Sequence, residues 1–143
     1  MKTHSILQMV VLSLIMLGCV QAQEFIVIVN KANPIESLTK TELNDIFLKK
    51  ELRWKSGEKI QPVNIVYSSE LREIFTRSIH QKTVNQIRSF WQQSIYSGKQ
   101  VQPIELTTET QMMAFVRDHI YSIGYVSSGA TLLGVKKITI RDE

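Results

Sequence analysis

Residues 62–75 read PVNIVYSSELREIF, which predicts a strand, a turn and a helix in direct succession. The apolar run that ends at Tyr67 is typical of a strand, and apolar residues spaced three and four apart after the serines indicate one face of a helix. A strand that turns through hydroxyl residues into a helix presents free backbone N–H groups and the positive end of the helix dipole. Because this arrangement suits an anion, Ser68, Ser69 and Arg72 are candidate ligands for an oxyanion.

The same three residues also have a purely structural interpretation. One serine can serve as the N-cap of the helix, and Arg72 can be a solvated residue of its first turn. Glu70 bears on the choice, because a carboxylate that points outward favours the helix dipole, whereas one that points inward repels an anion. The sequence leaves both interpretations open.

Strand and helix patterns alternate along the rest of the chain. The run FIVIV at residues 25–29 predicts a strand covered on both faces, as in parallel sheets, and further strands are predicted at 121–126 and 137–140. The other helices each open with a capping box: Thr39–Glu42, Thr83–Gln86 and Thr108–Gln111. This alternation predicts an α/β domain whose central, mostly parallel sheet is flanked by helices, with ligands beyond the carboxyl ends of the strands. The apolar helix faces predict burial of three aromatic residues: Phe47, Phe75 and Trp91. The same spacing places Ile95 on the face of Trp91.

The first 22 residues have the pattern of a signal peptide. A charged start precedes an apolar core from Ile6 to Leu17, and Val20-Gln21-Ala22 is a small-residue site of the kind that signal peptidase cleaves. The apolar core is shorter than the roughly 20 residues that span a membrane. We therefore expect residues 1–22 to be removed and residues 23–143 to form one periplasmic or secreted domain. The alternative is a lipoprotein tethered through Cys19, because Leu-Gly-Cys at this point resembles a lipidation site.

The sequence lacks the residue patterns of common catalytic sites. It contains no P-loop, no Gly-x-Ser-x-Gly turn and no His-Glu-x-x-His pair. His80 and His119 lie far apart and match no metal-ligand spacing, which favours surface or helix-end positions for both. Cys19 is the only cysteine, so cleavage after Ala22 leaves no thiol for catalysis or metal binding. We therefore expect neither an enzyme nor a bound metal or cofactor.

The charge pattern does not indicate nucleic-acid binding. The formal net charge is +4, and the basic cluster between Lys49 and Lys59 is interrupted by Glu51 and Glu58. A nucleic-acid-binding surface usually has a denser basic stripe with stacking aromatic residues. The cluster is more typical of a solvated loop.

Five segments together resemble phosphate-binding proteins of ABC transporters. They are IVIVNKANPIESLTKTELNDIF (26–47), Trp54, PVNIVYSSELREIF (62–75), FWQQSIYSGKQVQP (90–103) and SIGYV (122–126). In that family, a strand and an Asn-Pro turn precede a helix ending in Ile-Phe, then come a tryptophan loop and a strand that leads to an anion-binding turn. The likeness is closest to short exported proteins of this type with a single lobe. It implies one lobe of a type II periplasmic-binding-protein-like fold.

The chain departs from that family's pattern in ways that bear on function. The family's turn has Ser-Gly-Thr where this chain has Ser69, Glu70 and Leu71, and the family's Ile-Phe-x-Gly helix end is Ile46 to Lys49 here. Transport-type members close two lobes over the ligand, and residues 23–143 are too few for both. The resemblance therefore implies a module that binds phosphate or a similar oxyanion with low affinity, unless an envelope protein or a second copy supplies the missing lobe. The alternative is an envelope interaction module of the same fold that has lost the ligand.

Overall fold

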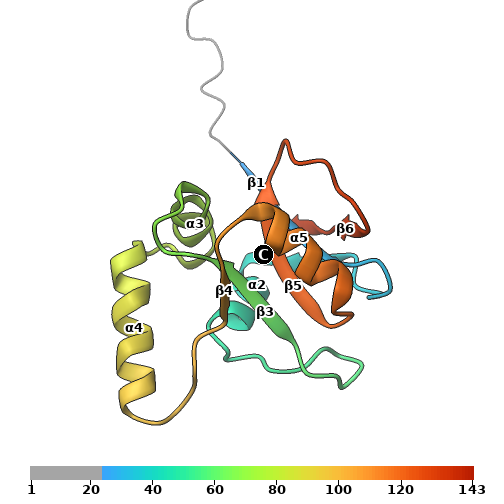
Figure 1. The fold of residues 1–143 in the computed structure, drawn as a ribbon. Coiled ribbons are helices and arrows are strands. Elements are labelled where there is room, and N and C mark those ends of the chain that lie inside the picture. Colours follow the sequence, from blue (N-terminus) through green and yellow to red (C-terminus); the bar gives the residue numbers. More distant parts are fainter. Residues whose placement is uncertain (1–23) are drawn as a thin grey trace, which may run out of the picture.

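A computed structural model describes residues 24–143, which contain a central five-stranded sheet with helices on both faces (Figure 1). The strands lie in the order β4 (Ile104–Leu106), β3 (Gln61–Ile65), β5 (Ser122–Ser127), β1 (Phe25–Asn30) and β6 (Val135–Lys137). The expected signal peptide at residues 1–22 and the alternative lipidation site at Cys19 lie outside the described residues.

Four of the five strands run in the same direction, as the sequence predicts for a mostly parallel sheet. β3 pairs in parallel with β4 and β5, whereas β1 pairs antiparallel with β5 and β6. The expectation that β1 is itself a parallel strand is therefore wrong, although its residues Val27, Ile28 and Val29 are fully buried. A continuous apolar run indicates that both faces of a strand are covered, and it carries no information on strand direction.

The helix α5 (Glu109–Asp118) covers one face of the sheet. It packs through Met112 and Val116, and the Asn30 side chain of β1 donates a hydrogen bond to the Val116 carbonyl at 3.0 Å. Gly124 of β5 lies on this face, and a Cβ there would overlap the sulfur of Met112. The missing side chain therefore lets the helix lie close against the strand.

The opposite face holds the aromatic core. α2 (Lys40–Phe47) and α3 (Glu70–Phe75), which continues into a π-helical turn η1 (Thr76–His80), pack there. Phe47 and Phe75 are 1% and 0% exposed, and both contact the ring of Tyr125 on β5. The predicted burial of these two phenylalanines is confirmed.

The helix α4 (Val84–Tyr96) stands to one side of the sheet (Figure 1). Trp91 is 2% exposed, as predicted, and packs with Ile87 and Leu48 in a small separate cluster. The sequence also predicts that Ile95 lies on this buried face, which is wrong, because Ile95 is 51% exposed. The last turn of α4 projects beyond the body of the protein, so no neighbouring element covers it.

The three capping boxes predicted from the sequence are all formed. The hydroxyls of Thr39, Thr83 and Thr108 accept hydrogen bonds from the N–H groups three residues later, at 3.1, 3.2 and 3.1 Å. In each case the Glu or Gln side chain returns a bond to the threonine N–H. These boxes fix where α2, α4 and α5 begin.

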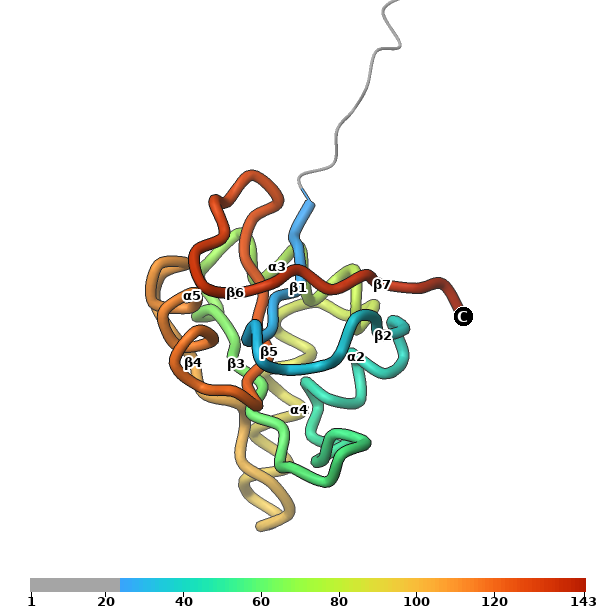
Figure 2. Tube along the Cα trace, turned by 90° about the vertical axis from the view of Figure 1, so that its right-hand side faces the viewer, coloured from blue at the N-terminus to red at the C-terminus, as the bar shows by residue number. Residues whose placement is uncertain are grey.

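The last two strands pair with the first two described strands. The single strand predicted at 137–140 is in fact two strands, β6 and β7 (Thr139–Arg141), with the buried Ile138 between them. β7 pairs in parallel with β2 (Ser37–Thr39), and Figure 2 shows the two segments side by side.

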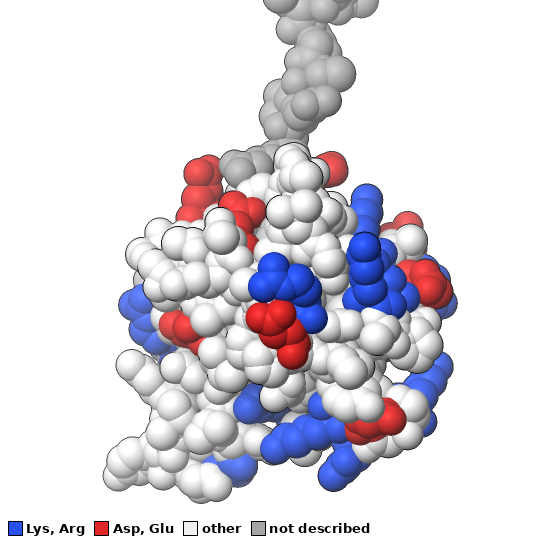
Figure 3. Space-filling view, turned by 45° about the vertical axis from the view of Figure 1, so that its right-hand side comes forward, with Lys and Arg blue, Asp and Glu red and all other residues white. Residues whose placement is uncertain are grey.

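On the face shown in Figure 3, basic side chains lie in several separate groups among acidic and uncharged ones.

Candidate functional site

The turn between β3 and α3 leaves helix N–H groups open at the carboxyl end of β3. Ser69 is the N-cap of α3, its backbone is extended, and its hydroxyl makes no capping hydrogen bond. Within residues 24–143, the N–H groups of Glu70, Leu71 and Arg72 have no hydrogen-bond acceptor. The first helical hydrogen bond of α3 runs from the Glu73 N–H to the Ser69 carbonyl. These donors point out of the first turn of a helix, where the helix dipole is positive.

At the two neighbouring turns of the same edge of the sheet, side chains of the protein accept hydrogen bonds from backbone N–H groups. After β4, the Gln111 side chain accepts hydrogen bonds from the N–H groups of Thr107 and Thr108, at 3.0 and 3.3 Å. After β5, the Glu109 carboxylate accepts bonds from the N–H and the hydroxyl of Ser127. The N–H groups of Glu109 and Thr110 at the start of α5 also have no acceptor within residues 24–143, so the β3–α3 turn differs from its neighbours in that no side chain accepts from the N–H groups of its helix start.

The structure separates the three residues that the sequence predicts as a site. Ser68 is exposed and Ser69 is half-buried, whereas Arg72 is 2% exposed and lies beneath the turn. The Arg72 guanidinium donates through Nη1 to the Ile65 carbonyl at 2.7 Å and lies 3.6 Å from a carboxylate oxygen of Glu105. Arg72 is thus neither a solvated residue nor a freely exposed anion ligand.

Three further residues lie close to this turn, and no local pattern in the sequence predicts their position there: Tyr67, Arg88 and Glu105. The guanidinium carbons of Arg72 and Arg88 lie 4.2 and 4.7 Å from the ring centroid of Tyr67. Burial raises the pKa of the Tyr67 hydroxyl, and the charge of Arg72 opposes this shift. Glu105 comes from β4 and Arg88 from α4, so only the strand order and the helix packing bring them to the turn.

Tyr125 supports the end of β3 from below. Its hydroxyl donates to the Asn64 side chain at 3.0 Å and accepts from the Ile65 N–H at 3.3 Å. Burial also raises the pKa of this hydroxyl. Tyr125 is 0% exposed, so it positions the strand that carries the turn and does not form a solvent-facing wall. Glu70 is exposed, which is the orientation compatible with an anion at the turn.

Residues 24–143 contain neither a metal-binding cluster nor a membrane-spanning helix. No group of three or more His, Cys, Asp or Glu side chains is arranged to hold a metal ion. Within the same residues, no helix has both the length and the apolar composition needed to cross a membrane.

The fold matches one lobe of solved phosphate-transport proteins. An ABC-type phosphate transport receptor from Vibrio cholerae superposes with a TM-score of 0.66 at 21% identity, covering 82% of this chain and 46% of that chain. A protein from Clostridium perfringens solved with bound phosphate, described as a phosphate ABC transporter substrate-binding protein, gives 0.66 at 20% identity and covers 82% and 45%. PstS from Borrelia burgdorferi gives 0.63 at 19% identity and covers 83% and 47%.

These likenesses define the class of fold. The chain has the fold of a single lobe of the phosphate-type periplasmic binding proteins, and it spans less than half the length of the proteins it matches. No protein-family model and no curated protein matches the sequence.

Proposed function

We propose that this protein is an exported, solute-binding-like lobe whose β3–α3 turn binds phosphate or a similar oxyanion. The observation that carries the proposal is the set of N–H groups of Glu70, Leu71 and Arg72, which have no acceptor within residues 24–143 and begin a helix without a side-chain cap. The descriptions of the structural neighbours as phosphate-transport proteins support the same class of ligand. The proposed role is binding, with no catalytic step.

The proposed site offers hydrogen-bond donors to an anion from one side only. The three N–H groups and the hydroxyls of Ser68 and Ser69 would contact the anion, while Arg72 contributes charge from beneath, reduced by Glu105. Charge-assisted hydrogen bonds contribute about 1.5–3 kcal/mol each, and association costs at least about 4 kcal/mol, which leaves roughly millimolar affinity for an open site. A second copy or an envelope protein that supplied an opposite wall would raise this affinity.

The test is a titration of backbone amide resonances with phosphate, sulfate and chloride. Phosphate and sulfate are expected to shift the amides of Ser69 to Arg72 more than chloride does. Ser69→Ala should weaken the response with little loss of stability, because the Ser69 hydroxyl makes no capping bond. Glu70→Gln should strengthen the response, since it removes a negative charge from the turn. Ser89→Ala, an exposed serine on α4, is the matched control. Amides that stay unmoved at tens of millimolar phosphate would exclude the site.

A second candidate is an envelope interaction module of the same fold without a ligand. The observation that favours it is the commitment of Arg72 to the Ile65 carbonyl and to Glu105, which directs its guanidinium away from an anion at the turn. The two candidates differ in thermal melting. A phosphate-specific rise in midpoint supports binding, because a ligand of the native state stabilises it, and no rise at tens of millimolar supports the interaction module.

Location is part of the proposal. We infer export directed by residues 1–22, with cleavage after Ala22, to give a soluble product that starts at Gln23. The intact mass of the exported protein tests this inference. A lipid-modified species that starts at Cys19 would contradict it and would make the protein a membrane-tethered lipoprotein.

A further inference from the structure

The imidazole ring of His80 is held in one tautomer by its neighbour Asn44. His80 is the last residue of η1 and is 9% exposed, and its Nδ1 lies 2.8 Å from Asn44 Oδ1. Asn44 presents its oxygen to the ring, because its amide nitrogen donates to Asp45 Oδ1 at 3.1 Å. The neutral ring therefore carries its proton on Nδ1, and Nε2 keeps a free lone pair.

This Nε2 atom opens onto a pocket. It has no hydrogen-bond partner within residues 24–143. The unpartnered side-chain atoms that are sealed from solvent in this part of the chain are Asn33 Nδ2, Thr76 Oγ1 and Glu105 Oε1. Nε2 is not among them, so it is reached from the pocket of about 280 Å³ that His80 lines. A nearly enclosed side chain thus presents an acceptor, and no donor, to this pocket.

The pocket lies between the first turns of α2 and the end of η1. Its lining residues are Lys40, Thr41, Asn44, Ile79, His80, Gln81 and Glu143. Glu143 supplies the one carboxylate of this lining, and its Oε1 accepts from the Thr41 N–H at 2.9 Å.

Cations outnumber this carboxylate around His80. Lys40 lines the pocket, and Lys50 and Lys82 lie close enough to lower the pKa of His80, after the larger effect of burial. None of these three lysines forms an ion pair within the described part of the chain. The surroundings therefore favour an anion over a cation.

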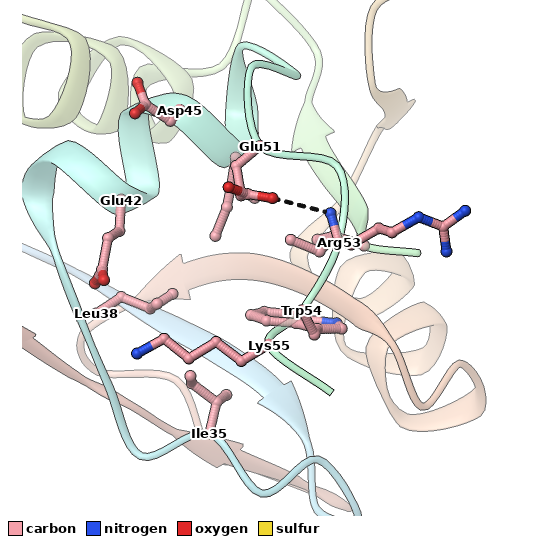
Figure 4. Close-up of a pocket in the computed structure, with 10 residues that line it drawn as sticks. Ile35, Leu38, Glu42, Asp45, Glu51, Arg53, Trp54 and Lys55 are labelled. Atoms are coloured by element: carbon pink, nitrogen blue, oxygen red, sulfur yellow. Dashed lines mark hydrogen bonds between the residues drawn. The ribbon is translucent and has the colours of Figure 1, made fainter. Parts of the chain in front are cut away.

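The two other candidate sites on the molecule are separate from this pocket. A pocket of about 340 Å³ lies against a different face of α2, and Figure 4 shows Asp45 pointing away from Glu42 and Glu51 there, so these carboxylates do not converge on one point. Ser69 of the proposed oxyanion turn and His80 lie at opposite ends of the continuous helix α3–η1, about 16 Å apart at 1.5 Å per residue.

We propose that the His80 pocket binds a small 2-hydroxy carboxylate. The hydroxyl would donate to His80 Nε2, and the carboxylate would contact the ammonium group of Lys40. An imidazole that can only accept selects a ligand with a hydrogen-bond donor, and the lysines select a negative charge. A monovalent carboxylate also matches the single cation in the lining, whereas phosphate needs more donors than this pocket supplies.

The test compares lactate with propionate, which has the same carboxylate and lacks the hydroxyl. The readout is the Nε2 resonance of His80 at about pH 7.5, where the ring is neutral. His119, whose ring stacks on Phe115, serves as the internal reference. Lactate is expected to shift the His80 resonance with a dissociation constant of about 10 mM. Propionate should bind about three- to ten-fold more weakly, because it offers no hydrogen bond to Nε2.

Phosphate separates this pocket from the oxyanion turn. It should move the His80 resonance less than lactate does, whatever its effect on the amides of Ser69 to Arg72. The outcome at His80 and the outcome at the turn are therefore independent of each other.

Two variants assign the roles of the lining residues. His80→Met should lower the affinity for lactate to that for propionate, as read from the Gln81 amide. Lys40→Gln changes an exposed side chain and should weaken both ligands about two-fold or more while their ratio persists. Lys99→Gln, an exposed lysine beyond the end of α4, is the matched control and should leave binding unchanged. Equal affinities of the unmodified protein for lactate and propionate would overturn the proposal. A His80 resonance unmoved at about 50 mM lactate would also overturn it.

Discussion

The ring of Phe75 lies parallel to the ring of Tyr125, with 3.8 Å between the ring centroids and 3° between the ring planes. Phe47 and Phe25 meet the Phe75 ring edge-on, at 4.8 and 5.2 Å. Phe75 thus joins α3 to the sheet directly beneath the turn that carries the candidate site. This aromatic contact with β5 and the hydrogen bond from Arg72 to the Ile65 carbonyl of β3 together hold α3, and with it the turn, against the sheet.

Phe75→Ala is expected to lower the free energy of unfolding by about 3–5 kcal/mol, since it leaves a cavity in a fully buried aromatic cluster. Chemical denaturation at constant pH measures the loss. Tyr96→Ala is the control, because Tyr96 is 95% exposed and its removal should change stability by no more than about 0.5 kcal/mol. A loss below about 1 kcal/mol for Phe75→Ala would mean that this cluster does not hold the helix.

Lys49 occupies a backbone position that favours glycine. It follows α2 with a φ of 54°, and its N–H and that of Lys50 bond back to the carbonyls of Ile46 and Asp45. This is a Schellman-type helix end, in which the left-handed residue is usually glycine. Lys49→Gly should therefore raise the free energy of unfolding by about 0.5–1 kcal/mol. Lys50→Gly, one residue later, should lower it, and equal effects of the two substitutions in a denaturant titration would refute the explanation.

Much of the fold follows from local patterns in the sequence. The threonine capping boxes, the three- and four-residue spacing on the helices and the apolar strands are all properties of neighbouring residues, and the structure confirms them. Strand direction is not local, so the antiparallel position of β1 is not predicted. The strands β2 and β4 have three residues each, which is too short for a periodic signal.

Local sequence patterns predict less of the candidate site than of the fold. Ser69 and its position before a helix could be read directly from the chain. The burial of Arg72 could not be predicted, because its counter-ion Glu105 lies on a different strand. The contact of Arg88 with the Tyr67 ring could not be predicted either, because Arg88 comes from α4. The sequence therefore indicates where a ligand turn lies, while the charge at that turn depends on tertiary contacts.

His80 is buried and is the last residue of η1, so of the two expected positions, surface or helix end, the structure shows the helix end. Its surroundings disfavour a charge. Burial lowers its pKa from the ordinary 6.5 to about 4, with smaller contributions from Arg72, Lys50 and Lys82. The imidazole lies 2.8 Å through Nδ1 from the Asn44 side-chain oxygen, to which the neutral ring donates. The unfolded chain therefore takes up a proton near pH 6.5, whereas the folded protein resists protonation until about pH 4.

The sign of this shift makes the protein less stable as the pH falls. The contribution is complete above pH 6.5, and the loss between pH 7.5 and pH 5 should be on the order of 2 kcal/mol. His80→Gln should remove that part of the pH dependence, as measured by denaturant titrations at both pH values. If wild type and variant lose equal stability, His80 is not the responsible group.

Gly124 sets the distance between β5 and α5. A Cβ at this position would overlap the Met112 sulfur and approach Val116 Cγ2 to 3.3 Å. Gly124→Ala should lower the free energy of unfolding by about 1–3 kcal/mol through overpacking. Gly129→Ala is the control, since no atom lies within 4 Å of the added methyl group there, and a change within about 0.5 kcal/mol is expected. Equal losses in the two variants would show that the Gly124 contact is not tight.

Glu105 determines how much of the Arg72 charge reaches the β3–α3 turn. Its carboxylate is 3.6 Å from the Arg72 guanidinium, and its Oε1 is buried without a hydrogen-bond donor within residues 24–143. Glu105→Gln should cost roughly 1–2 kcal/mol of stability, because Arg72 loses a partly buried counter-ion.

The same substitution should increase the phosphate response of the Ser69 to Arg72 amides by about two- to five-fold, since the uncompensated guanidinium then attracts an external anion. Arg72→Met combined with Glu105→Gln keeps the site free of both charges and should abolish this gain. An unchanged response in Glu105→Gln would show that Arg72 does not act on the turn, and would favour the interaction module over the oxyanion-binding lobe.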